Sequence, residues 1–387
     1  MTAIQPDLRK KKRFERLTDA QLLTIISGVI FALLFAIAVL SIEELKRPGI
    51  TFTTVLNSSC YLIILACALT VVMVGGGINI SVGGVICLTC MACAKFLNES
   101  GIEDPTLLLW ATFALAIGIG AVFGAFQGAL ISYLEIQPFI ITLAGMFLAR
   151  GLAMILSGGG NIKVDDANAF TKWMGDAEIK IQALGYQREK TRGGKVVAVF
   201  DVPAVLKWAS IIAIVVVIVI YLVMRYTKFG RNIYAIGGNA QSATMLGVNV
   251  KLTRFNSYLL SGALSGLAGF VFMMLNGAKG SSGTGLRTEM DAIAASIIGG
   301  TLLSGGVGNV IGSFFGTMIL GTLQSIIGFS GLQEAYWQQM ASGVMLGIFV
   351  VMQSIILSVR GKGKMSLPKW LHLSKKKSGG APDPSVI

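Results

Sequence analysis

Long apolar runs alternate with short polar stretches along most of the chain. A helix needs about 20 mainly apolar residues to cross a bilayer, and most of the runs reach or approach that length. Two of them are short and flanked by glycine, which is typical of broken helices beside a transport site. The pattern predicts an all-α polytopic membrane protein with about ten transmembrane segments. The segments are 22–42, 55–74, 82–96, 107–131, 139–156, 204–224, 258–275, 292–303, 310–327 and 340–357.

The polar positions between these segments carry an uneven charge. Charged residues make up 13% of the chain, against about 25% in soluble proteins, which excludes an ordinary soluble protein. The net charge of +13 is concentrated in residues 1–20, 225–254 and 358–387, and cytoplasmic loops of membrane proteins are rich in Lys and Arg. With ten membrane crossings, both ends of the chain and the loop after the sixth crossing lie on the same side of the membrane, so the three basic regions share that side. No basic soluble domain accompanies them, so we expect contact with membrane lipid and none with nucleic acid.

This topology defines the expected domain organisation. Residues 1–20 form a basic cytoplasmic N-terminus, residues 21–357 the transmembrane domain, and residues 358–387 a basic cytoplasmic tail. Within the membrane domain, 225–255 is a cytoplasmic loop and 158–203 an insertion on the opposite side. Segments 179–184 and 196–202 flank Arg192-Gly193-Gly194 and predict a β-hairpin, which either faces a partner or is a solvated insertion.

Two glycine clusters share one pattern, Gly-Gly-x-x-x-Ser followed closely by Gly-Gly, in residues 75–84 and 299–306. The recurrence predicts two related halves, roughly 53–157 and 256–357. Irregular backbone at membrane depth occurs only inside protein or beside water, so the clusters predict breaks that line a pathway for a polar, uncharged solute. The alternative is that glycine and serine only allow close helix packing. The candidate pathway residues here are Gly76, Gly77, Asn79, Ser81, Gly83, Gly299, Gly300, Thr301, Ser304 and Gly305.

A short helix is predicted in the central basic loop. Asn239 is a good N-cap and Gly247 a good left-handed stop, so residues 240–246 form about two turns. Such a helix is marginal alone and needs a docking surface, on this chain or another. A plain connector is the alternative.

At this point the sequence resembles a known family. Residues 235–270 (AIGGNAQSATMLGVNVKLTRFNSYLLSGALSGLAGF) resemble the coupling-helix region of ABC-type monosaccharide importer permeases, the ribose, xylose, galactoside and galactofuranose permeases of bacteria. Residues 75–84 resemble the family's GGIDLSVGS motif, 137–143 its PPFIATL, 150–152 its RGL, and 290–308 its LDAIAAVVIGGTSLSGG. The second half is most similar to galactofuranose-type permeases.

The resemblance implies a permease subunit of an ATP-binding-cassette importer in the bacterial plasma membrane, with both termini cytoplasmic. A second permease chain, identical or different, would complete the pathway, and an extracytoplasmic binding protein would deliver the monosaccharide. A separate ATPase subunit would bind ATP and Mg²⁺. This chain has no phosphate-binding loop motif, so we expect it to be no enzyme and to hold no cofactor.

The resemblance also assigns residues. Phe139 and Thr142, in the motif at 137–143, join the pathway candidates. Asn79 stands where the family commonly has an acid, which puts any role of a carboxylate there in doubt. No catalytic residue and no metal ligand is expected. The residues implied to contact the ATPase are Gly238, Asn239, Ala240, Gln241, Ser242, Ala243, Thr244, Met245, Leu246 and Gly247.

Other interpretations stay open. A permease of the same superfamily could carry a branched-chain amino acid or a nucleoside. A secondary carrier would need ionisable coupling groups inside the membrane, where Lys95 and Arg150 are nearly the only ones, and a channel would leave the helix at 240–246 without a role. Arg150 itself is either a pathway residue or a structural one.

Overall fold

Nine helices in the described residues are long and apolar enough to cross a membrane. The computed structural model describes residues 18–42, 45–165, 170, 178–192, 195–329 and 335–362. The chain is an all-α polytopic membrane protein, as the hydrophobic pattern predicts. The nine helices are α2 (Asp19–Ser41), α3 (Pro48–Val74), α4 (Val82–Glu99), α5 (Pro105–Tyr133), α6 (Pro138–Ser157), α8 (Trp208–Tyr226), α11 (Val250–Leu275), α13 (Val310–Phe329) and α14 (Ala335–Lys362).

Three shorter helices also lie in the described residues: α9 (Lys228–Gly238), α10 (Ala240–Met245) and α12 (Thr288–Ile298). Helix α12 corresponds to the segment 292–303, which the hydrophobic pattern counts among ten membrane segments. Its 11 residues span about 16 Å, roughly half of the hydrocarbon core. It ends because Gly300 adopts φ +95° and Gly299 packs directly on the backbone of Gly312, where no Cβ fits.

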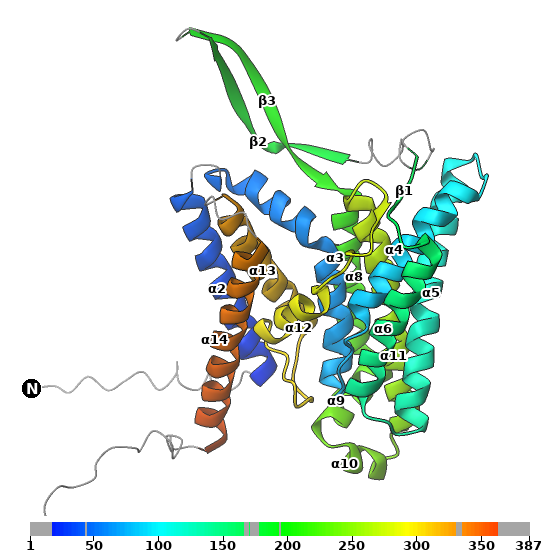
Figure 1. The fold of residues 1–387 in the computed structure, drawn as a ribbon. Helices are drawn as coiled ribbons and strands as arrows, with labels where there is room; N and C mark the ends of the chain where they lie inside the picture. Colours follow the sequence, from blue (N-terminus) through cyan, green and yellow to red (C-terminus); the bar gives the residue numbers. More distant parts are fainter. Residues whose placement is uncertain are drawn as a thin grey trace, which may run out of the picture.

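The two ends of the helix bundle are distinct. Figure 1 shows a long β-hairpin projecting from one end and α9 and α10 covering the other; we call them the hairpin end and the α10 end. The first turn of α2 and the last turns of α14 lie toward the α10 end. Residues 1–17 and 363–387, which include most of both predicted basic termini, fall outside the described residues.

The hairpin predicted around Arg192-Gly193-Gly194 is confirmed. Strands β2 (Glu178–Arg192) and β3 (Lys195–Lys207) pair antiparallel, and Arg192 lies opposite Lys195. Both strands are longer than the sequence pattern indicates, and β3 leads directly into α8. A second, two-residue pair joins β1 (Ile162–Lys163) to β4 (Lys279–Gly280), which ties the end of α6 to the loop before α12.

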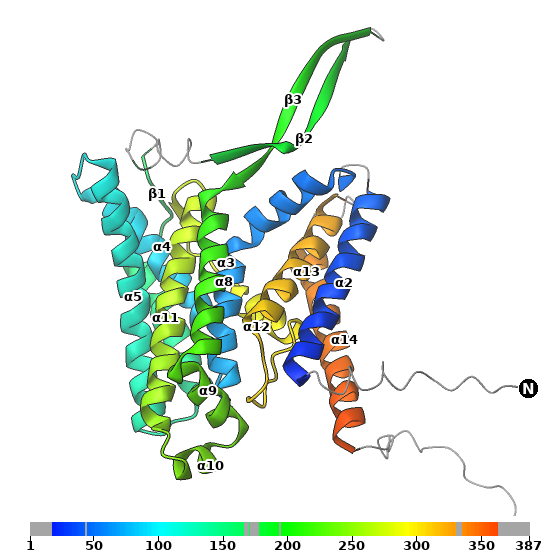
Figure 2. The same ribbon diagram turned by 180° about the vertical axis from the view of Figure 1, so that it is seen from behind.

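Helix α3 lies at the centre of the bundle. In the 18-residue apolar stretch of α3, 83% of the residues are buried inside the chain, against 17% in that of α2. Seen from behind, α2 lies beside α13 on one flank, while α8, α11 and α5 lie on the other (Figure 2). Helices α2, α6 and α14 therefore keep most of their surface available for lipid or for another chain.

Helices α5 and α11 pack backbone to backbone along a seam of glycines. A Cβ at Gly262 would lie 2.6 Å from Cα of Gly124, and one at Gly120 would lie 2.9 Å from Cα of Gly266. Only hydrogen fits at such positions, and small residues of this kind let membrane helices approach closely. The seam fixes α11 beside α5 and so positions both ends of α11 for the site.

Candidate functional site

The first helix break, residues 75–81 between α3 and α4, is held by buried polar side chains. The Asn79 amide nitrogen donates to the Ser261 hydroxyl on α11 at 3.0 Å, and its oxygen accepts from the backbone N–H of Ser81 at 3.1 Å. The Ser81 hydroxyl lies 2.9 Å from the amide oxygen of Gln127 on α5. Each of these four residues is at most 1% exposed. Asn79 and Ser81 therefore face the interior of this chain, where they position the break.

The second break, residues 299–309 between α12 and α13, is a tight loop pointing toward the α10 end (Figure 1). The N–H of Leu302 donates to the carbonyl of Val307 at 3.0 Å, and Gly305 and Gly306 at its tip adopt φ +84° and +77°. A residue with a Cβ is strained at such φ values. Thr301 is buried at the base of the loop, whereas Ser304 is exposed.

The two breaks meet at a cluster of glycines that also includes the end of α9. The N–H of Gly306 donates to the carbonyl of Val74 at 2.8 Å, and a Cβ at Gly305 would lie 2.9 Å from Cα of Gly76. A Cβ at Gly237 would collide with the same two atoms, the Val74 oxygen and the Gly306 nitrogen. We call Gly76, Gly237, Gly305 and Gly306 the glycine junction. It joins three segments that are distant in sequence.

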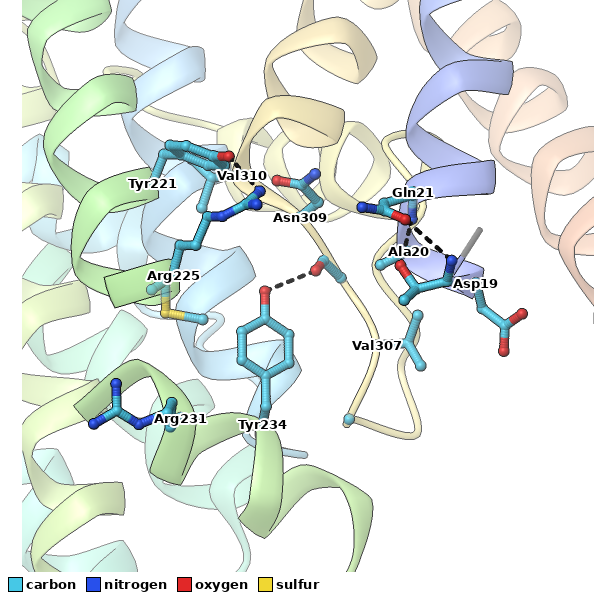
Figure 3. Close-up of a pocket in the computed structure, with 14 residues that line it drawn as sticks. Asp19, Ala20, Gln21, Tyr221, Arg225, Arg231, Tyr234, Val307, Asn309 and Val310 are labelled. Atoms are coloured by element: carbon cyan, nitrogen blue, oxygen red, sulfur yellow. Dashed lines mark hydrogen bonds between the residues drawn. The ribbon is translucent and has the colours of Figure 1, made fainter. Parts of the chain in front are cut away.

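A tyrosine on α9 adds a second tie to the same loop. The Tyr234 hydroxyl donates to the carbonyl of Gly308 at 2.8 Å, across a pocket of about 620 Å³ between α2, α8, α9 and the loop. Figure 3 shows Tyr234 directed at the loop, with Tyr221 and Arg225 across the pocket on α8. Burial raises the pKa of Tyr234, so its hydroxyl stays protonated and remains a donor.

Helix α10 forms the tip of the α10 end (Figure 1), and the predicted caps are confirmed. The Asn239 side chain accepts from the N–H of Ser242 at 2.9 Å, and Gly247 adopts φ +81°. Ala243 is buried, while Met245 and Leu246 are 88% and 82% exposed. Of the other residues implied to contact the ATPase, Ala240 is half-buried and the rest are exposed, namely Gly238, Asn239, Gln241, Ser242, Thr244 and Gly247.

Toward the hairpin end, a second pocket of about 550 Å³ opens between the start of α12, the last turns of α13 and the first turns of α14. Apolar residues such as Met290 and Leu346 form part of its wall. We call it the outer pocket. Its polar lining residues are Arg287, Asp291, Gln324, Gln338, Gln339 and Ser342, together with Glu289.

The two acids of α12 have different surroundings. Glu289 is buried and Asp291 is half-buried, and both line the outer pocket. The Glu289 carboxylate lies 3.8 Å from the Arg150 guanidinium, which also donates to the carbonyl of Gly285 at 2.9 Å. Arg150 thus ties α6 to the start of α12, which supports its structural interpretation.

The remaining pathway candidates lie on the first turns of α6 and α4 and in the first break. Thr142 is buried and its hydroxyl donates to the Pro138 carbonyl in its own helix at 2.8 Å, whereas Phe139 is 53% exposed. Gly83 packs against Glu289, and Gly77 against the Tyr258 hydroxyl. Sequence reasoning missed Gly237, Tyr234 and the outer pocket. The amides of Gln324, Gln338 and Gln339, unusual in apolar segments, were the available signal.

With this geometry established, comparison with known proteins gives the family. The sequence model of the family described as "Branched-chain amino acid transport system / permease component" matches residues 50–351. The chain belongs to this family. The resemblance to importer permeases inferred from the motifs is therefore confirmed, and the chain is a multi-pass membrane protein of a family of permease components.

Individual members of the permease-component family resemble the chain over most of its length. The inner membrane ABC transporter permease protein YjfF of Escherichia coli K12 is 38% identical over 313 residues, 79% of this chain and 85% of its own. The fructose import permease protein FruG of Bifidobacterium longum is 34% identical over 369 residues, 94% of this chain and 99% of its own. The ribose import permease protein RbsC of E. coli K12 is 32% identical over 295 residues, 75% and 81% of the two chains. No solved structure matches.

Proposed function

We propose that this chain is the permease subunit of an ATP-binding-cassette importer for a monosaccharide, in the inner membrane of a bacterium. Family membership supports the permease role, and the relatives named for fructose and ribose import support a sugar cargo. The α10 end would face the cytoplasm, and with it both termini. Exposed Arg225, Lys228 and Arg231 at that end agree with the excess of cations in cytoplasmic loops.

The observation that carries this proposal is the link from α10 to both helix breaks. Met245 at the end of α10 and Leu246, its C-cap residue, present two exposed apolar side chains. The base of α10 continues into α9, whose Gly237 touches the backbone of both breaks in the glycine junction. A partner that pushes on α10 when it binds ATP would bias the two breaks together. Coupling of this kind requires a contact that differs between two global states.

The partners follow from this arrangement. An ATPase subunit, holding ATP and Mg²⁺ itself, would receive α10. A second permease chain would cover part of the surface that α6 and α14 leave available, and lipid the rest. A binding protein carrying the sugar would dock at the hairpin end, where the β2–β3 hairpin projects (Figure 1).

A secondary carrier fits the described residues less well. Such a carrier moves its cargo with an ion and needs ionisable groups that can change state inside the membrane. Lys95 lies 3.9 Å from Glu99 one turn along the same helix, and Arg150 is engaged by Glu289 and two loop carbonyls. Both side chains therefore have partners within the chain.

The experiment is co-purification and uptake with an altered α10. The affinity-tagged full chain, expressed in its native host, should retain an ATPase subunit, and the complex in liposomes should take up radiolabelled D-ribose, D-fructose or D-galactose only with ATP. Met245→Asp places a charge where an apolar contact is expected, and losing the burial of one such side chain costs about 1.5–3 kcal/mol. The variant should lose the ATPase but still insert.

Leu134→Asp is the matched control, because Leu134 is 64% exposed at the same end but lies outside α10. Equal ATPase recovery from Met245→Asp and the unaltered chain would contradict the docking role of α10. Absence of ATP-dependent uptake of all the tested sugars by the intact complex would contradict the proposed function.

A further inference from the structure

We propose that the outer pocket is a binding subsite for the hydroxyl groups of the transported monosaccharide. The proposal rests on the function proposed above and adds a place in this chain where the cargo is held between its release outside and its passage inward. Within the pocket the carboxylate of Asp291, the guanidinium of Arg287 and three glutamine amides converge from three helices. Its volume, about 550 Å³, is within the range of about 300–1,000 Å³ usual for small-molecule sites.

The polar side chains of these helices line one cavity. On α14, Gln338 and Ser342 are four residues apart and lie on one face, which meets the start of α12. Gln324 enters from α13. Asp291 and Glu289 of α12 both line the pocket, and Glu289 also lies beside Arg150. The pocket is thus built from the same short helix that leads into the second break.

Most polar groups of the pocket are half-buried or exposed, and the charges of Asp291 and Arg287 interact with each other. None of the side chains of Arg287, Asp291, Gln324, Gln338, Gln339 and Ser342 forms a hydrogen bond or an ion pair with another described residue. Elsewhere in the bundle some polar groups are paired within the chain, whereas the hydroxyls of Thr89, Ser132 and Thr301 are buried without a hydrogen-bond partner among the described residues. Gln353, lower on the same helix α14, donates to the carbonyl of Ile297, and Ser296 donates to backbone carbonyls. Because most of the polar groups of the pocket are accessible rather than buried, they are available to a ligand that enters the pocket.

The backbone at the pocket entrance is also unusual. Arg287, which precedes the first residue of α12, adopts φ +68°. A non-glycine residue in this region is uncommon, and such residues cluster at ligand sites, where the surroundings hold them. This conformation places Arg287 at the rim of the pocket, directly before the acids of α12.

The donor set fits a sugar better than an ion or an amino acid. Amides both donate and accept, a carboxylate accepts two or more bonds, and a guanidinium donates, which matches the paired donor and acceptor character of vicinal hydroxyls. Met290, Leu286 and Leu346 supply an apolar wall for the C–H face of a pyranose or furanose ring. An amino acid would use Arg287 and Asp291 for its charged groups but would leave most of the amides without partners.

Thiol labelling of the intact transporter complex tests the subsite. All five native cysteines are buried and unpaired, so a cysteine introduced as Ser342→Cys provides a single reactive site facing the pocket. Ser325→Cys is the matched control on α13, because the Ser325 hydroxyl donates to Gly321 in its own helix at 2.9 Å and does not line the pocket. Labelling rates with a water-soluble maleimide are measured with and without the sugar that the complex transports best.

The transported sugar at ten times its Kd should slow labelling of Ser342→Cys about tenfold by mass action and leave Ser325→Cys unchanged. In uptake assays, Ser342→Ala should lower the transport rate about 3–10-fold and Asp291→Asn about 10–100-fold, with Ser325→Ala near the unaltered rate. If the altered side chain binds a hydroxyl group of the sugar, the variant should no longer prefer the sugar over the monodeoxy analogue that lacks this hydroxyl. A purely structural defect would leave that preference unchanged.

Three results would overturn the subsite. They are labelling of Ser342→Cys that no transported sugar slows, protection by L-leucine instead of a sugar, and no labelling at all because another subunit covers the pocket. Each of these is separate from a failure of the proposed function, which would appear as absence of sugar uptake by the unaltered complex.

Discussion

The substitution Gly237→Ala tests the glycine junction with the smallest possible change, one methyl group. The new Cβ would be directed between the carbonyl oxygen of Val74 and the backbone nitrogen of Gly306. These two atoms are hydrogen-bonded at 2.8 Å, so the methyl group cannot be accommodated without moving one break away from the other.

The cost can be worked from these contacts. Overpacking of a well-packed interior costs about 1–3 kcal/mol, and leaving a buried backbone donor or acceptor unpaired costs about 1–3 kcal/mol more. The sum, about 2–6 kcal/mol, equals or exceeds typical coupling free energies between sites, about 1–3 kcal/mol. We therefore expect ATP hydrolysis to persist while sugar uptake falls at least about tenfold.

The assay measures sugar uptake and ATP hydrolysis in the same proteoliposomes. Gly238→Ala is the matched control, because both glycines lie in α9 and gain the same helix propensity of about 1 kcal/mol, yet a Cβ at Gly238 meets nothing within 4 Å. Equal numbers of sugar molecules moved per ATP by Gly237→Ala, Gly238→Ala and the unaltered chain would refute the reasoning. If Gly237→Ala fails to assemble, Tyr234→Phe removes the bond to Gly308 without adding atoms and should slow uptake about 3–10-fold.

Three further predictions concern other parts of the structure. Arg150→Leu leaves Glu289 buried without its cation and should lower the free energy of unfolding by about 3–5 kcal/mol; thermal unfolding in detergent measures this, and Arg150→Leu combined with Glu289→Leu should recover part of the loss. Asn79→Leu removes the three hydrogen bonds that join Asn79 to Ser261 and Ser81, so uptake should fall more than the amount of chain in the membrane; unaltered uptake would contradict its positioning role. The unaltered chain should react with maleimide only after denaturation, because its five cysteines are buried, and fast labelling in the membrane would contradict the packing.

Local signals were enough to predict much of the fold. The long helices follow from the length of the apolar runs, and α10 follows from Asn239 and Gly247, whose capping roles depend only on near neighbours. The pairing of β2 with β3, which the sequence predicts on either side of Gly193 and Gly194, also follows from a local signal. By contrast, the early end of α12 depends on the contact of Gly299 with Gly312 in another helix, which no local pattern contains.

The same distinction between local signals and contacts of distant residues applies to the site. Gly237 and Gly238 are equivalent in the sequence, and only the orientation of α9 turns one toward Val74 and leaves the other open. Asn79 has the polarity of a pathway residue, but its partner Ser261 is distant in sequence and draws it into the interior. The outer pocket is lined by residues of three helices. The sequence shows that its polar side chains are unusual, but it does not show that they lie around one cavity.

The glycine seam between α5 and α11 limits how this molecule can change shape. Because the two backbones touch without intervening side chains, sliding or rotating one helix against the other would bring Cα atoms such as those of Gly124 and Gly262 into collision. The pair therefore has the mechanical freedom of one body and can serve as a fixed axis. The remaining helices would therefore have to move when the chain opens first toward one face of the membrane and then toward the other. The half-helix α12 and the two breaks are the shortest segments that can change position.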